Sequence, residues 1–258
     1  MKEVIEYFDK ESHMYEGIRW RGNFVSRYDF SVTKEALMPL LNGSDFLIDL
    51  GCGPGTWLKE FHRNHKRCVG VDISREMLKL CMKKHLPNVD VVLADCHKLP
   101  FRDQVFDTTL SSRVFIYLDL GKALRETNRI LKDNGSLVLL VQVERQSLYF
   151  KLRERLKKSI KFLEKADYLT AQILLAKVSE HFQIDQTKGA IFHEHVSQHA
   201  LASRPIALLL FSYLTMLFLL ERKFSVSFLK YFYASSIVIK ANKFTKTNQE
   251  NMNCVRSF

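Results

Sequence analysis

The sequence predicts an α/β fold built on a doubly wound sheet of seven strands, mostly parallel, with an antiparallel last strand. Short apolar runs of strand length alternate with amphipathic segments of helix length between residues 33 and 143. A glycine-rich turn joins the first apolar run to the helical segment that follows it. After residue 144 longer helical patterns take over, and we expect them to lie as extra helices over the C-terminal edge of the sheet.

The expected elements follow in order along the first part of the chain. Residues 33–41 place four apolar side chains on one side of a helix, and the Asn-Gly-Ser-Asp run at 42–45 ends it. Five strands and three further helices are then expected. The strands lie at residues 46–50, 68–72, 89–94, 106–111 and 136–143, and the helices at 56–65, 74–85 and 120–131.

The second part of the chain has a different pattern. Residues 146–164 form a basic amphipathic helix with an apolar stripe that includes Leu152, Leu156 and Ile160. The other expected elements are helices at 167–181 and 206–220 and strands at 182–192 and 231–242. We expect the tail from residue 243 to be polar and frayed.

The basic charge is concentrated in the C-terminal part of the chain. The net charge is +11, from 39 Lys and Arg against 28 Asp and Glu. Residues 1–144 carry 21 basic against 20 acidic residues, residues 145–165 carry 8 against 2, and residues 166–258 carry 10 against 6. A basic surplus favours an acidic partner such as nucleic acid or an anionic membrane surface. The sequence places any such contact after residue 144.

Cysteine usage and hydropathy exclude several classes of protein. The five cysteines form no C-x-x-C pair and their number is odd, which argues against a disulfide framework or a zinc ribbon and fits a reducing compartment. Residues 1–16 are acidic and have no apolar core, so they do not form a signal peptide. The uncharged run 206–220 is shorter than the ~20 residues of a spanning helix. We therefore expect a cytoplasmic protein in which this run is a buried or interfacial helix.

One motif carries most of the functional information. Residues 49–56 have the sequence Asp-Leu-Gly-Cys-Gly-Pro-Gly-Thr, between an expected strand and an expected helix. Glycines at such a turn let a ligand approach the main chain closely. Dinucleotide-binding loops space their glycines G-x-G-x-x-G, whereas the spacing here is G-x-G-x-G. The acid ahead of it, Asp49, disfavours a pyrophosphate but can order the loop and face a cationic ligand.

This stretch resembles motif I of the class I S-adenosylmethionine-dependent methyltransferases. Later landmarks match in order, because Asp72 ends the second strand, Asp95 follows the third, and Leu99-Pro100-Phe101 leads into the fourth. The resemblance covers residues 35–145 and looks most like the broad type 11 branch, which includes quinone C-methyltransferases and many small-molecule enzymes. It implies a Rossmann-like fold, S-adenosylmethionine as the cofactor, and methyl transfer as the reaction.

The resemblance also assigns roles to residues. Asp72 would accept hydrogen bonds from the ribose hydroxyls, and Ile73 and Met77 would flank the adenine. Asp95 and the backbone amide of Cys96 would bind the adenine amino group. Taken singly, Asp72 could instead cap the next helix and Asp95 could be a turn residue. The full expected cofactor-binding set is Asp49, Gly51, Cys52, Gly53, Gly55, Asp72, Ile73, Met77, Asp95, Cys96, Ser112 and Arg113.

The sequence indicates the catalytic residues less clearly than the cofactor-binding residues. His193, His195 and His199 follow the expected sixth strand, where a base or an H-x-H metal site is one interpretation and solvent-facing loop histidines are the simpler one. We take His195 and Tyr117 as the candidate catalytic residues and expect no metal ion. Other candidates at the expected mouth of the site are Tyr15, Trp20 and Arg21, with Arg19 or Arg21 as a contact for the cofactor carboxylate.

The expected acceptor is a small, lipophilic or membrane-associated molecule. The basic helix at 146–164 suits an anionic lipid surface, although a solvated polar face over a packed stripe is the simpler alternative. The apolar run 206–220 could add to that contact or line a substrate tunnel. Residues 111–114, Ser-Ser-Arg-Val, lack the Asn/Asp-Pro-Pro-aromatic motif of enzymes that methylate nucleic-acid amines, so nucleic acid is less favoured. An RNA-directed methyltransferase and a non-catalytic protein that keeps the cofactor fold stay open as alternatives.

These inferences divide one expected domain, residues 1–242, into functional parts. Its expected parts are a helical lid at 1–34, a cofactor-binding core at 35–145, acceptor-side helices with the sixth strand at 146–230, and the last strand at 231–242. The polar tail covers 243–258. The sequence gives no indication of an oligomeric state.

Overall fold

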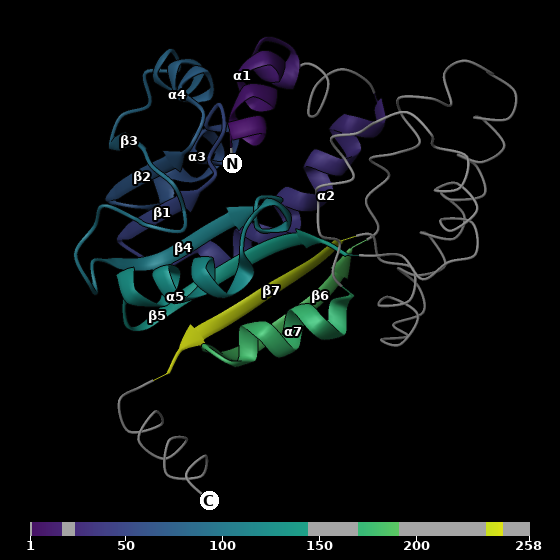
Figure 1. Ribbon diagram of the computed structural model, residues 1–258, viewed down its shortest axis with the longest axis vertical. Coiled ribbons are helices and arrows are strands. Elements are labelled where there is room, and N and C mark those ends of the chain that lie inside the picture. The colour runs from purple at the N-terminus through teal and green to yellow at the C-terminus, as the bar shows by residue number, and fades with distance from the viewer. Residues whose placement is uncertain (1, 17–23, 144–169, 191–235, 245–258) are drawn as a thin grey trace, which may run out of the picture.

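The computed structural model describes residues 2–16, 24–143, 170–190 and 236–244 (Figure 1). The strands among them are β1 Phe46–Leu50, β2 Arg67–Asp72, β3 Val89–Leu93, β4 Phe106–Ser112, β5 Leu131–Gln142, β6 Phe182–Ala190 and β7 Ser236–Lys243. They form one seven-stranded sheet in the order β3-β2-β1-β4-β5-β7-β6. Strands β1 to β5 pair in parallel, and β7 runs antiparallel to both β5 and β6. The predicted α/β fold with an antiparallel last strand is confirmed.

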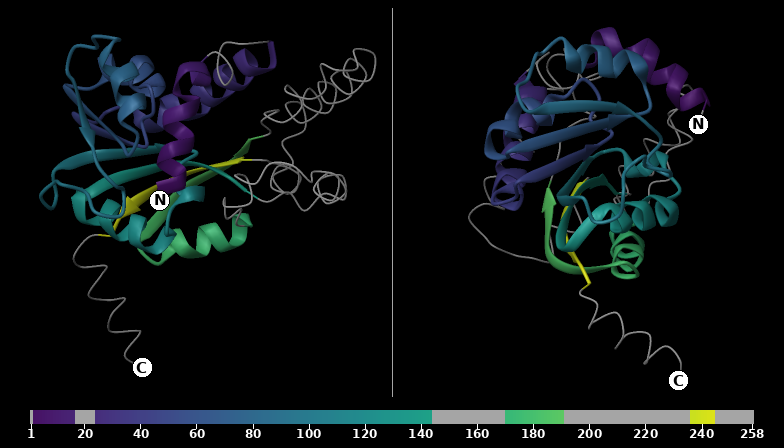
Figure 2. Two further views of the ribbon diagram at one scale, coloured as in Figure 1. Left: turned by 45° about the horizontal axis from the view of Figure 1, so that its top comes forward. Right: turned by 90° about the vertical axis from the view of Figure 1, so that its left-hand side faces the viewer.

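Helices cover both faces of this sheet (Figure 2). The described helices are α1 Lys2–Glu16, α2 Phe24–Leu41, α3 Thr56–Phe61, α4 Arg75–Met82, α5 Leu120–Ile130 and α7 Ala171–Ser179, with short 3-10 turns at His62–Asn64 and Phe115–Tyr117. Helices α2, α3 and α4 share one hydrophobic cluster with one face of the sheet, and α5 and α7 share a second cluster with the other face. None of the described helices is long and apolar enough to cross a membrane.

The central strands are buried on both faces. Leu47 of β1 packs in the cluster of α2, α3 and α4, whereas Ile48 packs in the cluster of α5 and α7. In β5, Leu140 packs in the cluster of α2, α3 and α4, and Leu139 packs in the cluster of α5 and α7. Burial on both faces explains why these strands are continuous apolar runs instead of alternating polar and apolar residues.

Several expected boundaries differ in the structure. The expected boundary of the N-terminal lid, at residue 34, falls inside the continuous helix α2, whose C-terminal half belongs to the core. The sequence leaves residues 132–135 between a helix expected to end at 131 and a strand expected to begin at 136, but the structure includes them in β5. The pairing partner of β4 jumps there from Leu131 to Ser136, and Asn134 has a φ of +64°, so this segment is an irregularity of the ladder. Strand β7 ends at Lys243, one residue beyond the expected end of the last strand.

The sheet order also determines where a ligand can bind. Strand β1 lies between β2 and β4, so the connections from β1 and β4 leave in opposite directions at the carboxyl ends of these strands. Such a switch point opens a crevice at that edge of the sheet. Helix α1 lies across this edge and contacts α4 (Figure 1). The predicted helices at 146–164 and 206–220 lie outside the described residues.

Candidate active site

The turn between β1 and α3 contains three glycines in left-handed backbone conformations. The φ angles of Gly51, Gly53 and Gly55 are +72°, +54° and +75°, a region that glycine enters without steric cost. The backbone N–H groups of Gly51 and Cys52 donate to the carbonyl oxygen of Val71 at 2.7 and 2.9 Å. These bonds tie the loop to the end of β2.

The surroundings of the three glycines differ. A Cβ atom at Gly51 would lie 2.1 Å from Cγ2 of Val114, and one at Gly55 would lie 2.3 Å from Sγ of Cys81. A Cβ atom at Gly53 would meet nothing closer than a ring atom of α1 at 4.0 Å. Close packing therefore requires the first and third glycines, whereas the middle one leaves its main chain open to a ligand.

Asp72 ends β2 beside this loop. Its Oδ2 accepts a hydrogen bond from the N–H of Gly53 and its Oδ1 accepts one from the N–H of Ser74, both at 2.8 Å. Burial raises the pKa of Asp72 above its ordinary value, while the backbone N–H groups of Ser74, Gly53 and Ile73 act in the opposite direction. Each carboxyl oxygen keeps a second lone pair, so the group can also accept hydrogen bonds from ligand hydroxyls.

Asp95 follows β3 and is oriented by a histidine. The N–H of Asp119 donates to Nε2 of His97 at 2.9 Å, so a neutral ring keeps its proton on Nδ1. That nitrogen lies 2.7 Å from Oδ1 of Asp95, and the backbone N–H of His97 donates to the same oxygen at 2.9 Å. These contacts occupy Oδ1, and Oδ2 is the atom of Asp95 that can accept from a ligand.

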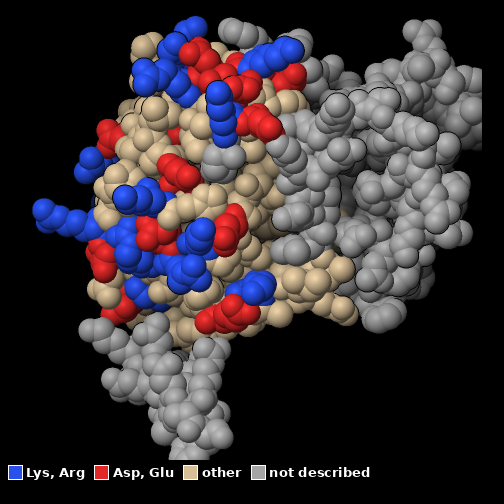
Figure 3. Space-filling view, in the orientation of Figure 1, with Lys and Arg blue, Asp and Glu red and all other residues tan. Residues whose placement is uncertain are grey.

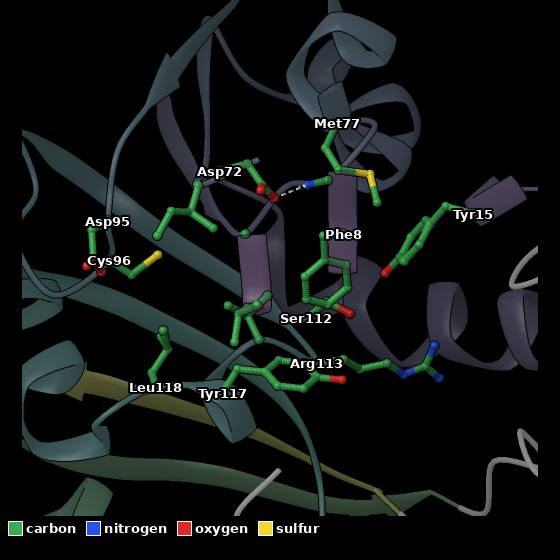
Figure 4. A pocket seen from close by; sticks show the side chains of 15 residues that line it. Phe8, Tyr15, Asp72, Met77, Asp95, Cys96, Ser112, Arg113, Tyr117 and Leu118 are labelled. Carbon is green, nitrogen blue, oxygen red and sulfur yellow. Dashed lines mark hydrogen bonds between the residues drawn. The ribbon is translucent and has the colours of Figure 1, made fainter. Parts of the chain in front are cut away.

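A pocket with an empty volume of about 680 Å³, part of it open to solvent, joins these groups (Figure 4). Most of the predicted site residues line it. The predicted residues in its wall are Gly51, Gly53, Asp72, Ile73, Met77, Asp95, Cys96, Ser112, Arg113 and Tyr117.

Three predicted cofactor residues, Asp49, Cys52 and Gly55, do not line the pocket. Asp49 is 1% exposed, and within the described part of the chain its carboxyl oxygens have no hydrogen-bond partner. Burial is the first cause that raises the pKa of Asp49 well above its usual range, and Cys81 and Asp72 add to it. The structure thus places this carboxyl group behind the glycine loop instead of facing the pocket.

Helix α1 covers the pocket with aromatic side chains. The ring of Phe8 meets Tyr117 edge-on at 5.5 Å between centroids and Tyr15 at 6.4 Å. The carboxylate of Asp9 accepts a hydrogen bond from the hydroxyl group of Ser74, the N-cap residue of α4. The described part of the predicted lid is therefore attached directly to the element that follows Asp72.

The sequence-based set lacked several wall residues. Val4 and Phe8 of α1 and Val114 and Leu118 after β4 also line the pocket. No motif marks them, because their contribution is apolar surface that many residue types can supply. The orienting role of His97 was also missed, although its place two residues after Asp95 was the available signal.

The catalytic candidates divide into two groups. Tyr117 and Tyr15 line the pocket, whereas His193, His195, His199, Arg19, Trp20 and Arg21 lie outside the described residues. Burial is the main cause that raises the pKa of Cys96 to about 12, so this thiol stays protonated at neutral pH and is not a nucleophile. Within the described ranges, no group of three or more His, Cys, Asp or Glu residues could hold a metal ion.

Comparison with known proteins matches this geometry. Residues 48–139 match the family model described as a methyltransferase domain. The glycine loop, the two strand-end acids and the sheet order agree with this match, so this part of the chain is similar to the class I methyltransferase domains that the sequence motifs indicated. S-adenosylmethionine is the cofactor of this class.

Two relatives show how far the similarity extends. An uncharacterized protein of Methanocaldococcus jannaschii is 35% identical over 139 residues, which cover 54% of this chain and 51% of that protein. The malonyl-[acyl-carrier protein] O-methyltransferase of Legionella pneumophila is 36% identical over 141 residues, which cover 53% of this chain and 48% of that protein. The chain thus spans about half the length of these curated relatives.

Solved structures with low sequence identity share the fold. The [4+2]-cyclase SpnF superposes with a TM-score of 0.67 at 15% identity, covering 94% of this chain and 96% of that chain. The geranyl diphosphate C-methyltransferase of Streptomyces coelicolor, in complex with S-adenosyl-L-homocysteine, superposes with a TM-score of 0.59 at 16% identity, covering 83% of this chain and 79% of that chain. One of these two proteins is named a cyclase, so the fold alone does not define the reaction.

The pocket residues fit S-adenosylmethionine. Asp72 offers two carboxyl oxygens for ribose hydroxyls, and Ile73 and Met77 offer an apolar surface for a flat ring. Asp95 has an oxygen that can accept from an amino group, and Gly53 leaves main-chain space at the same edge.

Proposed function

We propose that this chain transfers the methyl group of S-adenosylmethionine to a small acceptor molecule. The observation that carries the proposal is the joint placement of the glycine loop, Asp72 and Asp95 around one pocket. A protein that had kept the fold but lost the cofactor would not need both acids in ligand-accepting positions. We assign Asp72 to the ribose, Asp95 to the adenine amino group, and Ile73 and Met77 to the ring.

The protein's part in such a reaction is mainly alignment. When bound, S-adenosylmethionine supplies a methyl group that its sulfonium already activates. The walls around Ser112 and Val114 and the cover from Phe8 hold the acceptor in one orientation and exclude water. Such alignment can lower a barrier by roughly 7–11 kcal/mol. We propose that the hydroxyl group of Tyr117 orients the acceptor's nucleophilic atom through a hydrogen bond.

A small-molecule acceptor is supported by relatives of the chain. Two similar proteins, from Thermotoga maritima and Staphylococcus haemolyticus, are named demethylmenaquinone methyltransferases and are each 34% identical over less than half of this chain. A lipophilic acceptor at an anionic membrane surface stays a prediction of the sequence, because the segments that suggest it, 146–164 and 206–220, lie outside the described residues.

Incubation with radiolabelled S-adenosylmethionine and a fractionated cell extract tests the proposal. We expect label in a small-molecule fraction, either lipid or aqueous, and loss of that label in a Tyr117→Phe variant that still binds S-adenosylhomocysteine. Label in the RNA fraction would favour the RNA-directed alternative. A protein that binds S-adenosylhomocysteine and labels no fraction would favour the non-catalytic alternative.

A further inference from the structure

His97 adjoins the pocket wall at the end that we assign to adenine. Asp95 and Cys96, directly before it in the chain, line the pocket, and so does Leu118 ahead of α5. In Figure 4 these three residues lie at the same side of the pocket. His97 itself does not line the pocket, and its side chain is only 17% exposed. Any influence of the ring on a ligand therefore acts through the wall residues that it holds.

The imidazole ring of His97 joins two segments of this wall. On one side, Nδ1 lies 2.7 Å from Oδ1 of Asp95, which follows β3. On the other side, Nε2 accepts a hydrogen bond of 2.9 Å from the backbone N–H of Asp119, the N-cap residue of α5. That N–H belongs to the planar peptide group between Leu118 and Asp119, so the bond also fixes the main chain of Leu118. One side chain thus positions a polar and an apolar part of the wall.

The bond from Asp119 determines where the ring carries its proton. Nε2 accepts only through a lone pair, so a neutral ring has its proton on Nδ1. Oδ1 of Asp95 therefore meets the ring N–H as well as the backbone N–H of His97, which donates to it at 2.9 Å. Because these two groups engage Oδ1, Oδ2 is the acceptor that the carboxyl group presents to a ligand.

A carboxyl oxygen in a fixed position distinguishes two related bases. Adenine carries a 6-amino group, which donates hydrogen bonds, whereas hypoxanthine carries a 6-oxo group, which only accepts them. Oδ2 of Asp95 attracts the first group and repels the second, and a site that selects by such hydrogen bonding rejects the mismatched analogue. A carboxyl group that turned freely would move its oxygen away from the oxo group. The discrimination therefore depends on what holds Asp95, and the ring of His97 supplies part of that hold.

We propose that His97 is a positioning residue that determines the base specificity of the cofactor site. Its contact with Asp95 selects adenine over hypoxanthine, and its contact with Asp119 places Leu118 against either base. The inference rests on the proposed function, because it takes the pocket as an S-adenosylmethionine site with Asp95 at the adenine amino group. It assigns the choice of base to a residue that does not itself line the pocket.

Calorimetry with two ligands that differ only in the base tests this inference. S-adenosylhomocysteine carries adenine, and S-inosylhomocysteine carries hypoxanthine on the same sugar and amino acid. Each is titrated into the full-length protein, and we expect the wild type to bind the adenine compound at least about tenfold more tightly. Equal affinities would overturn the inference alone. Absence of S-adenosylhomocysteine binding would overturn the proposed function and the inference with it.

Two variants separate the two contacts of the ring. His97→Gln places an amide near the position of Nε2, where its oxygen can accept from Asp119, and leaves no donor at the position of Nδ1. The backbone contact with Asp95 remains, but the carboxyl group can turn about it, so we expect the adenine preference to fall to about threefold or less. His97→Asn places its amide near Nδ1 and leaves no acceptor for Asp119. Its adenine preference should stay within about threefold of the wild type, while its affinity for both ligands falls by similar factors.

His62 offers a matched control for the loss of a histidine contact. Its Nδ1 lies 3.1 Å from Oδ1 of Asn88, and it is not among the pocket-lining residues. His62→Gln should therefore leave the adenine preference unchanged. Thermal unfolding shows what each substitution costs in stability. Should His97→Gln fail to fold, His97→Ala takes its place, because it also removes the ring contact with Asp95.

Three results from the variants would overturn the inference. The first is an undiminished adenine preference in His97→Gln, and the second is an equal loss of preference in His62→Gln. The third is a preference lost equally in His97→Asn and His97→Gln, because the contact with Asp95 would then not be its cause. None of these results affects the proposed function, provided that the wild type binds S-adenosylhomocysteine.

Discussion

At the scale of single residues, Asp49 shows how the glycine motif combines binding and packing. The residue lies at the end of β1, and its neighbours across the sheet are Gly70 in β2 and Leu110 in β4. Its side chain is enclosed, and burial raises the pKa of the carboxyl group well above the ordinary value. We infer that Asp49 keeps its proton to a higher pH in the folded protein than in the unfolded chain, and that its side chain lies behind the glycine loop.

This protonation predicts a dependence of stability on pH. The unfolded chain loses the proton of Asp49 near the ordinary pKa of about 3.9, whereas the folded protein loses it only at a higher pH. Between these two pKa values the folded state binds more protons, so raising the pH lowers the free energy of unfolding by up to about 1.4 kcal/mol per pH unit. Asp49→Asn removes this contribution. Urea unfolding without cofactor at a series of pH values from about 4 upward should therefore show a shallower decline for Asp49→Asn than for the wild type, and parallel curves would contradict the account.

The family resemblance predicted most of the pocket wall but not which way each side chain faces. Gly51 and Gly53 line the pocket as expected, whereas Cys52 lies against Gly70 in the core and Gly55 lies against Cys81. These orientations depend on the left-handed backbone of the loop, which residue order alone does not fix. The sequence also did not predict that Phe8 lines the pocket, because no motif marks this residue.

At the scale of elements, the attachment of α1 to α4 joins the cover of the pocket to its wall. The hydroxyl group of Ser74 accepts a hydrogen bond from the N–H of Met77 at 3.1 Å, as an N-cap does, and also donates to Asp9 of α1. The N–H of Glu76 lies 3.4 Å from the same carboxylate oxygen. The Ser74 side chain thus caps α4 and holds α1 over the pocket.

Replacement of this serine should weaken both stability and binding. Loss of an N-cap costs about 1 kcal/mol, and Ser74→Ala also removes the contact with Asp9. Thr170→Ala is a matched control, because Thr170 is the N-cap of α7 and is not among the pocket-lining residues. Both variants should lower the free energy of unfolding similarly, whereas only Ser74→Ala should weaken S-adenosylhomocysteine binding in calorimetry. Equal affinities in the two variants would show that α1 does not control the site.

Element bounds were predictable to within a few residues wherever an apolar run was continuous. Strand β1 matches its prediction residue for residue, and β2 and β4 differ by one residue at one end. The larger differences arise where hydrogen bonds decide the boundary. Helix α3 ends at Phe61 because a 3-10 turn continues to Asn64. The docking of α1 joins residues 65 positions apart, and a single sequence has no local signal for such a contact.

At the scale of the whole molecule, the charge distribution separates the cofactor part from the rest. Basic and acidic side chains are interspersed over the described face in Figure 3, and several form ion pairs, such as Arg67 with Asp90 and Arg129 with Glu126. This agrees with the near balance of 21 basic and 20 acidic residues in residues 1–144. Most of the basic surplus lies in segments outside the described residues. The segments predicted to contact the acceptor are among them, so the structure defines the cofactor site more fully than the acceptor site.

The central claim is that the pocket beside Asp72 binds S-adenosylmethionine, and calorimetry with S-adenosylhomocysteine tests it most directly. Asp72→Asn keeps the size of the side chain and an oxygen for the contact with Gly53, but it removes the charge and one acceptor. Asp90→Asn, in β3, is the control, because Asp90 is exposed and not among the pocket-lining residues. We expect one molecule bound per chain, unchanged affinity in Asp90→Asn, and a loss of at least about tenfold in Asp72→Asn. Absence of binding by the wild type, or equal affinity in Asp72→Asn, would contradict the account.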